Sequence, residues 1–360
     1  MRREIRSLPV LHRVSIFTFC SLLLTAMTAL CDESANNRSS DYILATGFTG
    51  GTYYHAGLAI ATQIDVRMMP YNEFGLVARP TAGSVENIQM LENGKADMAI
   101  LQNYVVAGLR KPGQETALAG HVPLASIGWL WKNVEHFLLD RQYVSDGTLS
   151  DLHHVIGKPV YLGAKSSGTR LSTTLILGSL GIHFPDEDMV FTNYDGAVGE
   201  LDHESIVFAS LPGGDPVSAV ARAFATLGPS VSMLEVTDDE LKSIQEMAPQ
   251  WKRAVIPAGT YPLQTTDVAS IAQYNLLVVR ADMPVEDVYL ITKEIYNNAD
   301  RLSKVHPALL ELADTIENID QIWPPLHPGA ARYFTERENA LRENETSPSE
   351  SAQPTLSQKP

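Results

Sequence analysis

The stretch Gly47-Phe48-Thr49-Gly50-Gly51-Thr52-Tyr53-Tyr54 decides the fold class of this chain. It follows the apolar run 42–45, which predicts a buried strand, and Thr52 can cap a helix that extends to about Met68. A strand, a glycine turn and a helix in this order leave the first N–H groups of the helix without partners at the end of the sheet. Such a helix end attracts a carboxylate or a phosphate.

Two further turns repeat this arrangement. The first, Thr81-Ala82-Gly83-Ser84-Val85-Glu86-Asn87, precedes an expected helix that Ser84 can cap and that ends at Gly94. The second, Ser166-Ser167-Gly168-Thr169-Arg170, follows an expected strand over 159–163 and begins a helix that Gly181 stops. Three such turns in one chain indicate a pocket for a small anion.

Strand and helix patterns alternate from residue 41 to about 130, and a second alternating set begins near residue 143. This order predicts an α/β fold of two lobes, each with a mostly parallel sheet, and a ligand at the carboxyl ends of the strands. We expect lobe I over 41–130 plus about 267–343 and lobe II over 131–266. Hinge strands are expected near 126–131 and 254–266. The Ser-, Pro-, Glu- and Gln-rich segment 344–360 is expected to be a disordered tail.

The N-terminus predicts export. Residues 1–31 have a basic end, a short apolar stretch and small residues after it, as in a secretory signal peptide, and 32–40 are a polar linker. Cys31 allows a lipid anchor, but Leu30 stands where lipoprotein cleavage sites usually have a small residue. Ordinary cleavage is therefore favoured. The apolar stretch is too short for an ordinary transmembrane helix.

The chain is acidic, with a formal net charge of −15. The signal carries four arginines and one glutamate, so its removal takes the charge to −18. This charge disfavours nucleic acid and anionic membrane surfaces as partners. An anion site must therefore create its positive potential locally.

The motifs together resemble the TAXI class of periplasmic solute receptors, which serve TRAP transporters. The resemblance runs in family order over about residues 42–335. It is carried by Ala45-Thr46-Gly47, Gly50-Gly51-Thr52-Tyr53-Tyr54, Gly83-Ser84-Val85-Glu86-Asn87, Glu92-Asn93-Gly94-Lys95-Ala96-Asp97, Ala99-Ile100-Leu101-Gln102, Leu162-Gly163, Ser167-Gly168-Thr169-Arg170 and His327-Pro328-Gly329-Ala330.

The resemblance implies a two-lobe periplasmic-binding-protein fold of the type II kind, with the ligand in a cleft between the lobes. It also implies that the lobes close on a small organic anion or amino acid, such as glutamate or glutamine, and deliver it to TRAP membrane permease subunits. Ten residues are the candidate ligand contacts: Gly51, Thr52, Tyr53, Ser84, Asn87, Gln102, Ser167, Gly168, Thr169 and Arg170. Arg170 enters because a cation in the first turn of a helix opposes the helix dipole, which makes a carboxylate partner plausible.

One departure from the family pattern concerns the cargo. Many relatives have an acidic residue two positions after the glutamine, where this chain has Tyr104. If that acid contacts an ammonium group in relatives, its absence here favours a plain carboxylate over an amino acid as the ligand.

The sequence gives no sign of catalysis. It contains neither HExxH nor GxSxG, and its histidines show no paired ligand spacing, so we expect no metal, no other cofactor and no enzyme activity. Two alternatives stay open: a ligand-sensing module for a membrane signalling partner, and an exported α/β hydrolytic enzyme.

Overall fold

The computed structural model describes residues 41–72, 74–109, 123–312, 319 and 321–346. The expected signal peptide, the linker and Cys31 lie outside these residues. So does most of the expected tail, although helix α11 continues to Thr346 and therefore includes its first three residues. Within the described residues, no helix combines the length and the apolarity that a membrane span requires.

Lobe I is built on a mixed sheet in the order β2-β1-β3-β10-β4, with β9 paired to β10. Its strands β1, β2 and β3 are parallel, as the sequence predicts, but the long strand β10 runs antiparallel to both β3 and β4. The bounds are β1 Tyr42–Ala45, β2 Leu76–Arg79, β3 Met98–Gln102, β4 Leu124–Val134, β9 Lys252–Ile256 and β10 Val268–Arg280.

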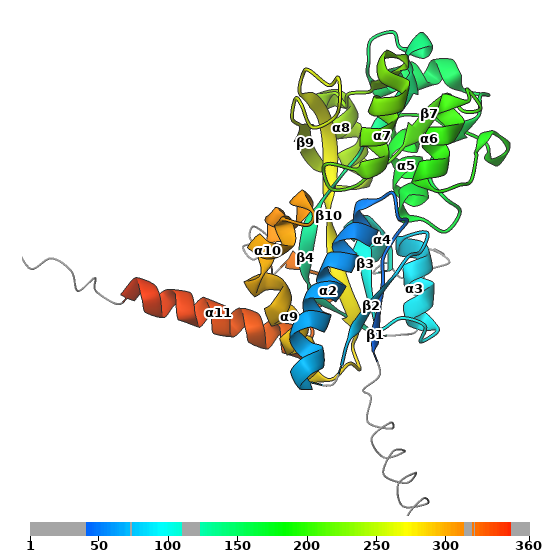
Figure 1. The fold of residues 1–360 in the computed structure, drawn as a ribbon. Coiled ribbons are helices and arrows are strands. Elements are labelled where there is room, and N and C mark those ends of the chain that lie inside the picture. Colours follow the sequence, from blue (N-terminus) through cyan, green and yellow to red (C-terminus); the bar gives the residue numbers. More distant parts are fainter. Residues whose placement is uncertain (1–40, 73, 110–122, 313–318, 320, 347–360) are drawn as a thin grey trace, which may run out of the picture.

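Helices cover both faces of this sheet because its strands alternate apolar side chains between the two sides. On β3, Met98 and Ile100 join the core under α2, α9 and α11, whereas Ala99 and Leu101 join the core under α3 and α4. The helices of this lobe are α2 Thr52–Asn72, α3 Ser84–Glu92, α4 Asn103–Leu109, α9 Val285–Asn297, α10 Ala299–Ser303 and α11 Pro328–Thr346. The end of α11 extends away from the lobe (Figure 1).

Lobe II has a second, smaller sheet in the order β6-β7-β5-β8. Its faces are packed by α6 and α7 on one side and by α5 and α8 on the other. The bounds are β5 Phe137–Asp140, β6 Val160–Tyr161, β7 Phe208–Ser210, β8 Val231–Met233, α5 Gly168–Ser179, α6 Tyr194–Asp202, α7 Ser218–Leu227 and α8 Asp238–Met247. Short 3₁₀ turns lie at Arg141–Tyr143, Leu149–Val155, Asp186–Asp188, Gly228–Ser230 and Pro307–Leu312.

The two lobes are joined where β4 and β10 pass side by side from one core to the other (Figure 1). On β4 the change of core falls between Trp131 and Val134, and on β10 between Ala272 and Leu276, next to a register shift in their pairing. The crossing therefore lies just after the expected hinge at 126–131. Where the chain returns to lobe I on β10, the crossing lies after the expected hinge at 254–266, because β9 still packs with the core of lobe II.

Candidate functional site

A small pocket lies between the lobes, where the three glycine turns of the sequence meet. Its volume is about 40 Å³, so little free space remains between the lobes in this arrangement. Lobe I contributes most of the wall and lobe II the rest. The lining residues are Gly47, Phe48, Gly51, Thr52, Tyr53, Ala82, Gly83, Ser84 and Gln102 from lobe I, Asn133 from the crossing part of β4, and Gly168, Thr169, Tyr194 and Pro212 from lobe II.

Seven of the ten candidate contacts named from the sequence line this pocket. They come from turns more than a hundred residues apart and are Gly51, Thr52, Tyr53, Ser84, Gln102, Gly168 and Thr169. The other three, Asn87, Ser167 and Arg170, lie outside the lining, and each has protein partners of its own.

Three helices begin at the pocket: the first residues of α2 line it, and α3 from lobe I meets α5 from lobe II across the lobe boundary. Glycines with positive φ make the tight turns before α3 and α5, Gly83 at +115° and Gly163 at +122°. In the described part of the chain, the N–H groups of Ser84, Gly168 and Thr169 have no protein acceptor, as expected at a helix start. Two residues further along α3, the Glu86 N–H donates to the Ser166 carbonyl at 3.1 Å. The Glu86 N–H thus joins the two lobes, whereas the N–H groups of Ser84, Gly168 and Thr169 remain available to a bound molecule.

The lobes approach each other closely at Gly168. A Cβ atom at this position would lie 2.8 Å from the Ser84 hydroxyl oxygen and 3.0 Å from the Gln102 amide carbon. Both neighbours belong to lobe I, whereas Gly168 begins α5 in lobe II. A larger residue here would have to displace the Ser84 and Gln102 side chains or hold the lobes farther apart.

Thr52 and Ser84 are not helix caps, contrary to the prediction from the sequence. The Thr52 hydroxyl bridges the lobes, because it donates to the Gly214 carbonyl at 2.8 Å and accepts from the Gly214 N–H at 3.1 Å. Ser84 is the first residue of α3 after Gly83, and its oxygen accepts the Gln102 N–H at 3.0 Å. Each hydroxyl thus bonds a distant segment instead of its own helix.

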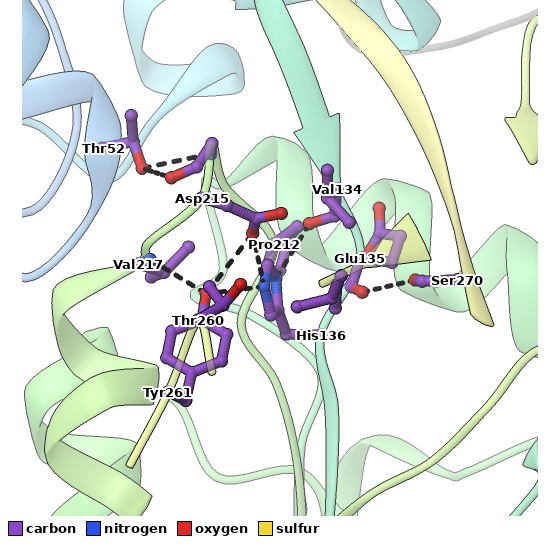
Figure 2. A network of polar contacts seen from close by, with 12 residues as sticks. Thr52, Val134, Glu135, His136, Pro212, Asp215, Val217, Thr260, Tyr261 and Ser270 are labelled. Atoms are coloured by element: carbon purple, nitrogen blue, oxygen red, sulfur yellow. Dashed lines mark hydrogen bonds and ion pairs between the residues drawn. The ribbon is translucent and has the colours of Figure 1, made fainter. Parts of the chain in front are cut away.

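The loop that contains Gly214 is fixed from both lobes (Figure 2). Asp215 lies 2.8 Å from Nε2 of the fully buried His136, which follows the strand crossing. The Tyr261 hydroxyl lies 2.8 Å from the same nitrogen and accepts the Val217 N–H at 3.0 Å. This network holds Pro212 and Gly214 against the pocket.

Two tyrosines shape the walls of the pocket. Tyr53 donates to Asn275 at 2.5 Å and lies edge-on to Trp131, with ring centres 5.9 Å apart. Tyr194 donates to the Pro212 carbonyl at 2.8 Å, and its oxygen is 2.9 Å from that of Thr169. Burial raises the pKa of both hydroxyls, so both rings stay uncharged.

Arg170 and Ser167 have structural partners. The Arg170 guanidinium is 2.7 Å from the Asp186 carboxylate and lies over the Phe191 ring. Ser167 is the true cap of α5, because its oxygen accepts the Arg170 N–H at 3.1 Å. The lining of the pocket consequently contains no charged residue, so its positive potential comes from the helix starts.

Asn87 has a structural place in lobe I, where it is fully buried. Its amide nitrogen donates to the carbonyls of Thr46 at 2.7 Å and Ile100 at 2.9 Å, and its oxygen accepts from Thr81 at 2.6 Å. The side chain thus joins α3 to two strands behind the pocket.

Replacing Asn87 by alanine is expected to lower the free energy of unfolding by about 3 kcal/mol, because two buried carbonyls and one hydroxyl lose their partner. Asn93→Ala, at the exposed end of the same helix, is the control and should change stability by less than about 0.5 kcal/mol. Urea unfolding measures both values. Equal stabilities of the two variants would contradict this role for Asn87.

A row of buried amides forms the floor beneath the pocket, and the sequence reasoning missed most of it. Gln102 pairs across β3 and β10 with Asn275, and Gln273 pairs across β10 and β4 with Asn133. Asn133 lines the pocket with 1% of its surface exposed, and its Nδ2 has no hydrogen-bond partner among the described residues. The position of Asn133 near the end of a mostly buried strand was the available signal.

The remaining lining residues missed from the sequence are glycines and apolar or aromatic residues of the turns, together with Tyr194 and Pro212. Tyr194 offered no local signal, since nothing near it in sequence marks a pocket. Among the described residues, no group of three or more His, Cys, Asp or Glu side chains is placed to hold a metal ion.

The two sheets, the paired crossing strands and the pocket between the lobes define a two-lobe periplasmic-binding-protein fold. Residues 44–337 match the model of the NMT1-like family, and the chain belongs to this family. No curated protein matched the sequence.

Several solved structures of periplasmic binding proteins are similar to this chain at low sequence identity. BugD matches with 10% identity and a TM-score of 0.49, covering 85% of this chain and 97% of BugD. The alkanesulfonate-binding protein SsuA from Xanthomonas axonopodis pv. citri, bound to MOPS, matches with 11% identity and a TM-score of 0.42, covering 83% and 84%. The aliphatic sulphonate-binding SsuA from Escherichia coli matches with 12% identity and a TM-score of 0.40, covering 85% and 93%.

Proposed function

We propose that this protein is an extracytoplasmic solute-binding receptor that captures a small carboxylate by closing its two lobes. The observation that carries this proposal is the meeting of two helix starts, one from each lobe, in a pocket without a charged lining residue. The open N–H groups of Ser84, Gly168 and Thr169 would hold the carboxylate. Because one helix start belongs to each lobe, an anion between them favours the closed form.

The other lining residues would orient the cargo. Gln102 offers an amide at the end of β3, and Asn133 offers an unpartnered N–H group from β4. Tyr53 and Thr52 complete the wall on the lobe I side, while Gly51 permits close approach of the backbone. Removal of water on closure strengthens each of these hydrogen bonds.

We further propose that the partner is a TRAP-type membrane permease, as the resemblance to TAXI receptors implies, and that the protein works in the periplasm after export by residues 1–31. Lobe I would comprise 41–130 and about 267–343, and lobe II 131–266. The strand pair at the crossing would act as the hinge, since only it and its flanking turns join the two cores covalently.

A thermal-unfolding screen of the purified protein with small carboxylates and amino acids tests the proposed function. A ligand at a hundredfold excess over its Kd should stabilise the protein by about 2.7 kcal/mol. Matched alcohols and amines without a carboxylate serve as controls and should give no shift. A shift with sugars or cations, but with none of the acids, would overturn the anion proposal.

A further inference from the structure

Glu135 is a buried acid that no contact within the described residues explains. It lies in the crossing between the two sheets with 1% of its surface exposed, and neither carboxyl oxygen has a hydrogen-bond partner among those residues. Its backbone is fully used, because its N–H donates to Ile271 at 2.9 Å and its carbonyl accepts from Ser270 at 2.6 Å (Figure 2). A buried polar group without partners is costly, so a missing partner is indicated.

Glu135 lies two residues after Asn133, which lines the pocket, although Glu135 is not itself part of the lining. Alternate residues of an extended chain point to one side, so Glu135 follows Asn133, whose unpartnered Nδ2 belongs to the pocket wall. The charge of Glu135 also acts on the hydroxyls of Tyr53 and Tyr194, two further wall residues, and raises the pKa of both. Its sequence neighbour Asn133 and these two tyrosines belong to the pocket wall, so the acid lies close behind that wall.

Among the residues that the structure describes, no positive side chain forms an ion pair with the acid. His136 is next in the chain but turns to the other side, where it contacts Asp215 at 2.8 Å (Figure 2). Tyr53 and Tyr194 are uncharged. The Ser172 hydroxyl lowers the pKa of Glu135 in part, yet it donates to the Thr169 carbonyl at 3.1 Å. Burial dominates and raises the pKa of the Glu135 carboxyl to about 8, so the empty receptor holds it mostly protonated at neutral pH.

Resting on the proposed function, we propose that Glu135 is the specificity-determining acid of this pocket and receives a protonated nitrogen of the cargo. The cargo is then a zwitterion, with its carboxylate at the starts of α3 and α5 and its ammonium at Glu135. On binding, the Glu135 O–H bond breaks and its proton leaves to solvent, while the cargo keeps its own proton and the ion pair forms. Capture at neutral pH therefore releases close to one proton. Glu135 would then take the role of the acidic residue that many relatives have two positions after the glutamine, where this chain has Tyr104.

Matched pairs of acids test this inference: L-glutamate against glutarate, and L-alanine against propionate. We expect the unchanged protein to bind at least one amino acid tenfold or more tighter than its deaminated partner. Glu135→Gln should abolish this preference and leave the affinity for the deaminated acid within threefold. Glu187→Gln, at an exposed site in lobe II, is the matched control and should retain the preference.

Calorimetry of the unchanged protein in two buffers with different ionisation enthalpies counts the protons and does not depend on how the variant folds. Release of close to one proton at pH 7 supports the inference. No proton release, or an undiminished preference in Glu135→Gln, overturns it while the proposed function stands. Binding of neither partner in any pair, together with a screen in which no acid binds, overturns both.

Discussion

Gly168→Val is expected to weaken cargo binding at least a hundredfold while the protein stays folded. The glycine begins α5, and a Cβ there would lie 2.8 Å from the Ser84 oxygen and 3.0 Å from the Gln102 amide carbon across the lobe boundary. The γ-methyl groups extend further into the space of these two buried side chains, which opposes closure of the lobes. A hundredfold loss corresponds to about 2.7 kcal/mol of binding free energy. Titration calorimetry with the best ligand of the screen measures it.

The fold should tolerate this change, because only the closed arrangement brings lobe I against Gly168 and valine costs a helix no more than glycine does. X-ray scattering should then show the same radius of gyration with and without cargo. Gly199→Val is the matched control, since no atom lies within 4 Å of a Cβ at that glycine in α6. An affinity of Gly168→Val within threefold of the unchanged protein would disprove this account of closure.

The local part of the site was predictable because glycine turns between strands and helices leave a local signature. The sequence placed β1, α3 and α5 to within a few residues, and seven of its ten candidate contacts line one pocket. The roles of individual hydroxyls were not predictable. Thr52 and Ser84 were expected to cap helices and instead bond Gly214 and Gln102, whereas Ser167 was expected at the ligand and caps α5. The same hydroxyl oxygen can cap its own helix or bond a distant segment, and the tertiary structure decides which of these bonds forms.

The floor of the pocket could not be predicted, because it depends on the register of β10 between β3 and β4. This register places Gln273 opposite Asn133 and Asn275 opposite Gln102, over sequence separations of more than a hundred residues. Asn133 and the following Glu135 carry polar groups in a segment that otherwise reads as buried strand. Such conflicts between burial and polarity are where function is most often found.

The second large effect expected is on stability, and it depends on pH. Glu135→Gln should stabilise the protein by an amount that grows from near zero at pH 4.5 to about 4 kcal/mol at pH 8. Below pH 4.5 the Glu135 carboxyl is protonated in both the folded and the unfolded chain. As the pH rises, the unfolded chain loses this proton at its ordinary pKa of 4.5, whereas burial raises the folded pKa to about 8. The unchanged protein therefore loses about 1.4 kcal/mol of stability per pH unit in this window, and the glutamine variant does not.

Urea unfolding of both proteins at half-unit steps from pH 4 to 9, without cargo, measures this difference. Other carboxylates titrate in the same range, but they are common to both proteins and cancel in the comparison. Glu187→Gln provides the baseline and should give a difference that stays flat with pH. The difference for Glu135→Gln should level off above pH 8, where the buried carboxyl is ionised in both states. If the stability difference for Glu135→Gln also stays flat from pH 4 to 9, Glu135 is solvated or already paired. The acid then holds no proton that cargo could displace.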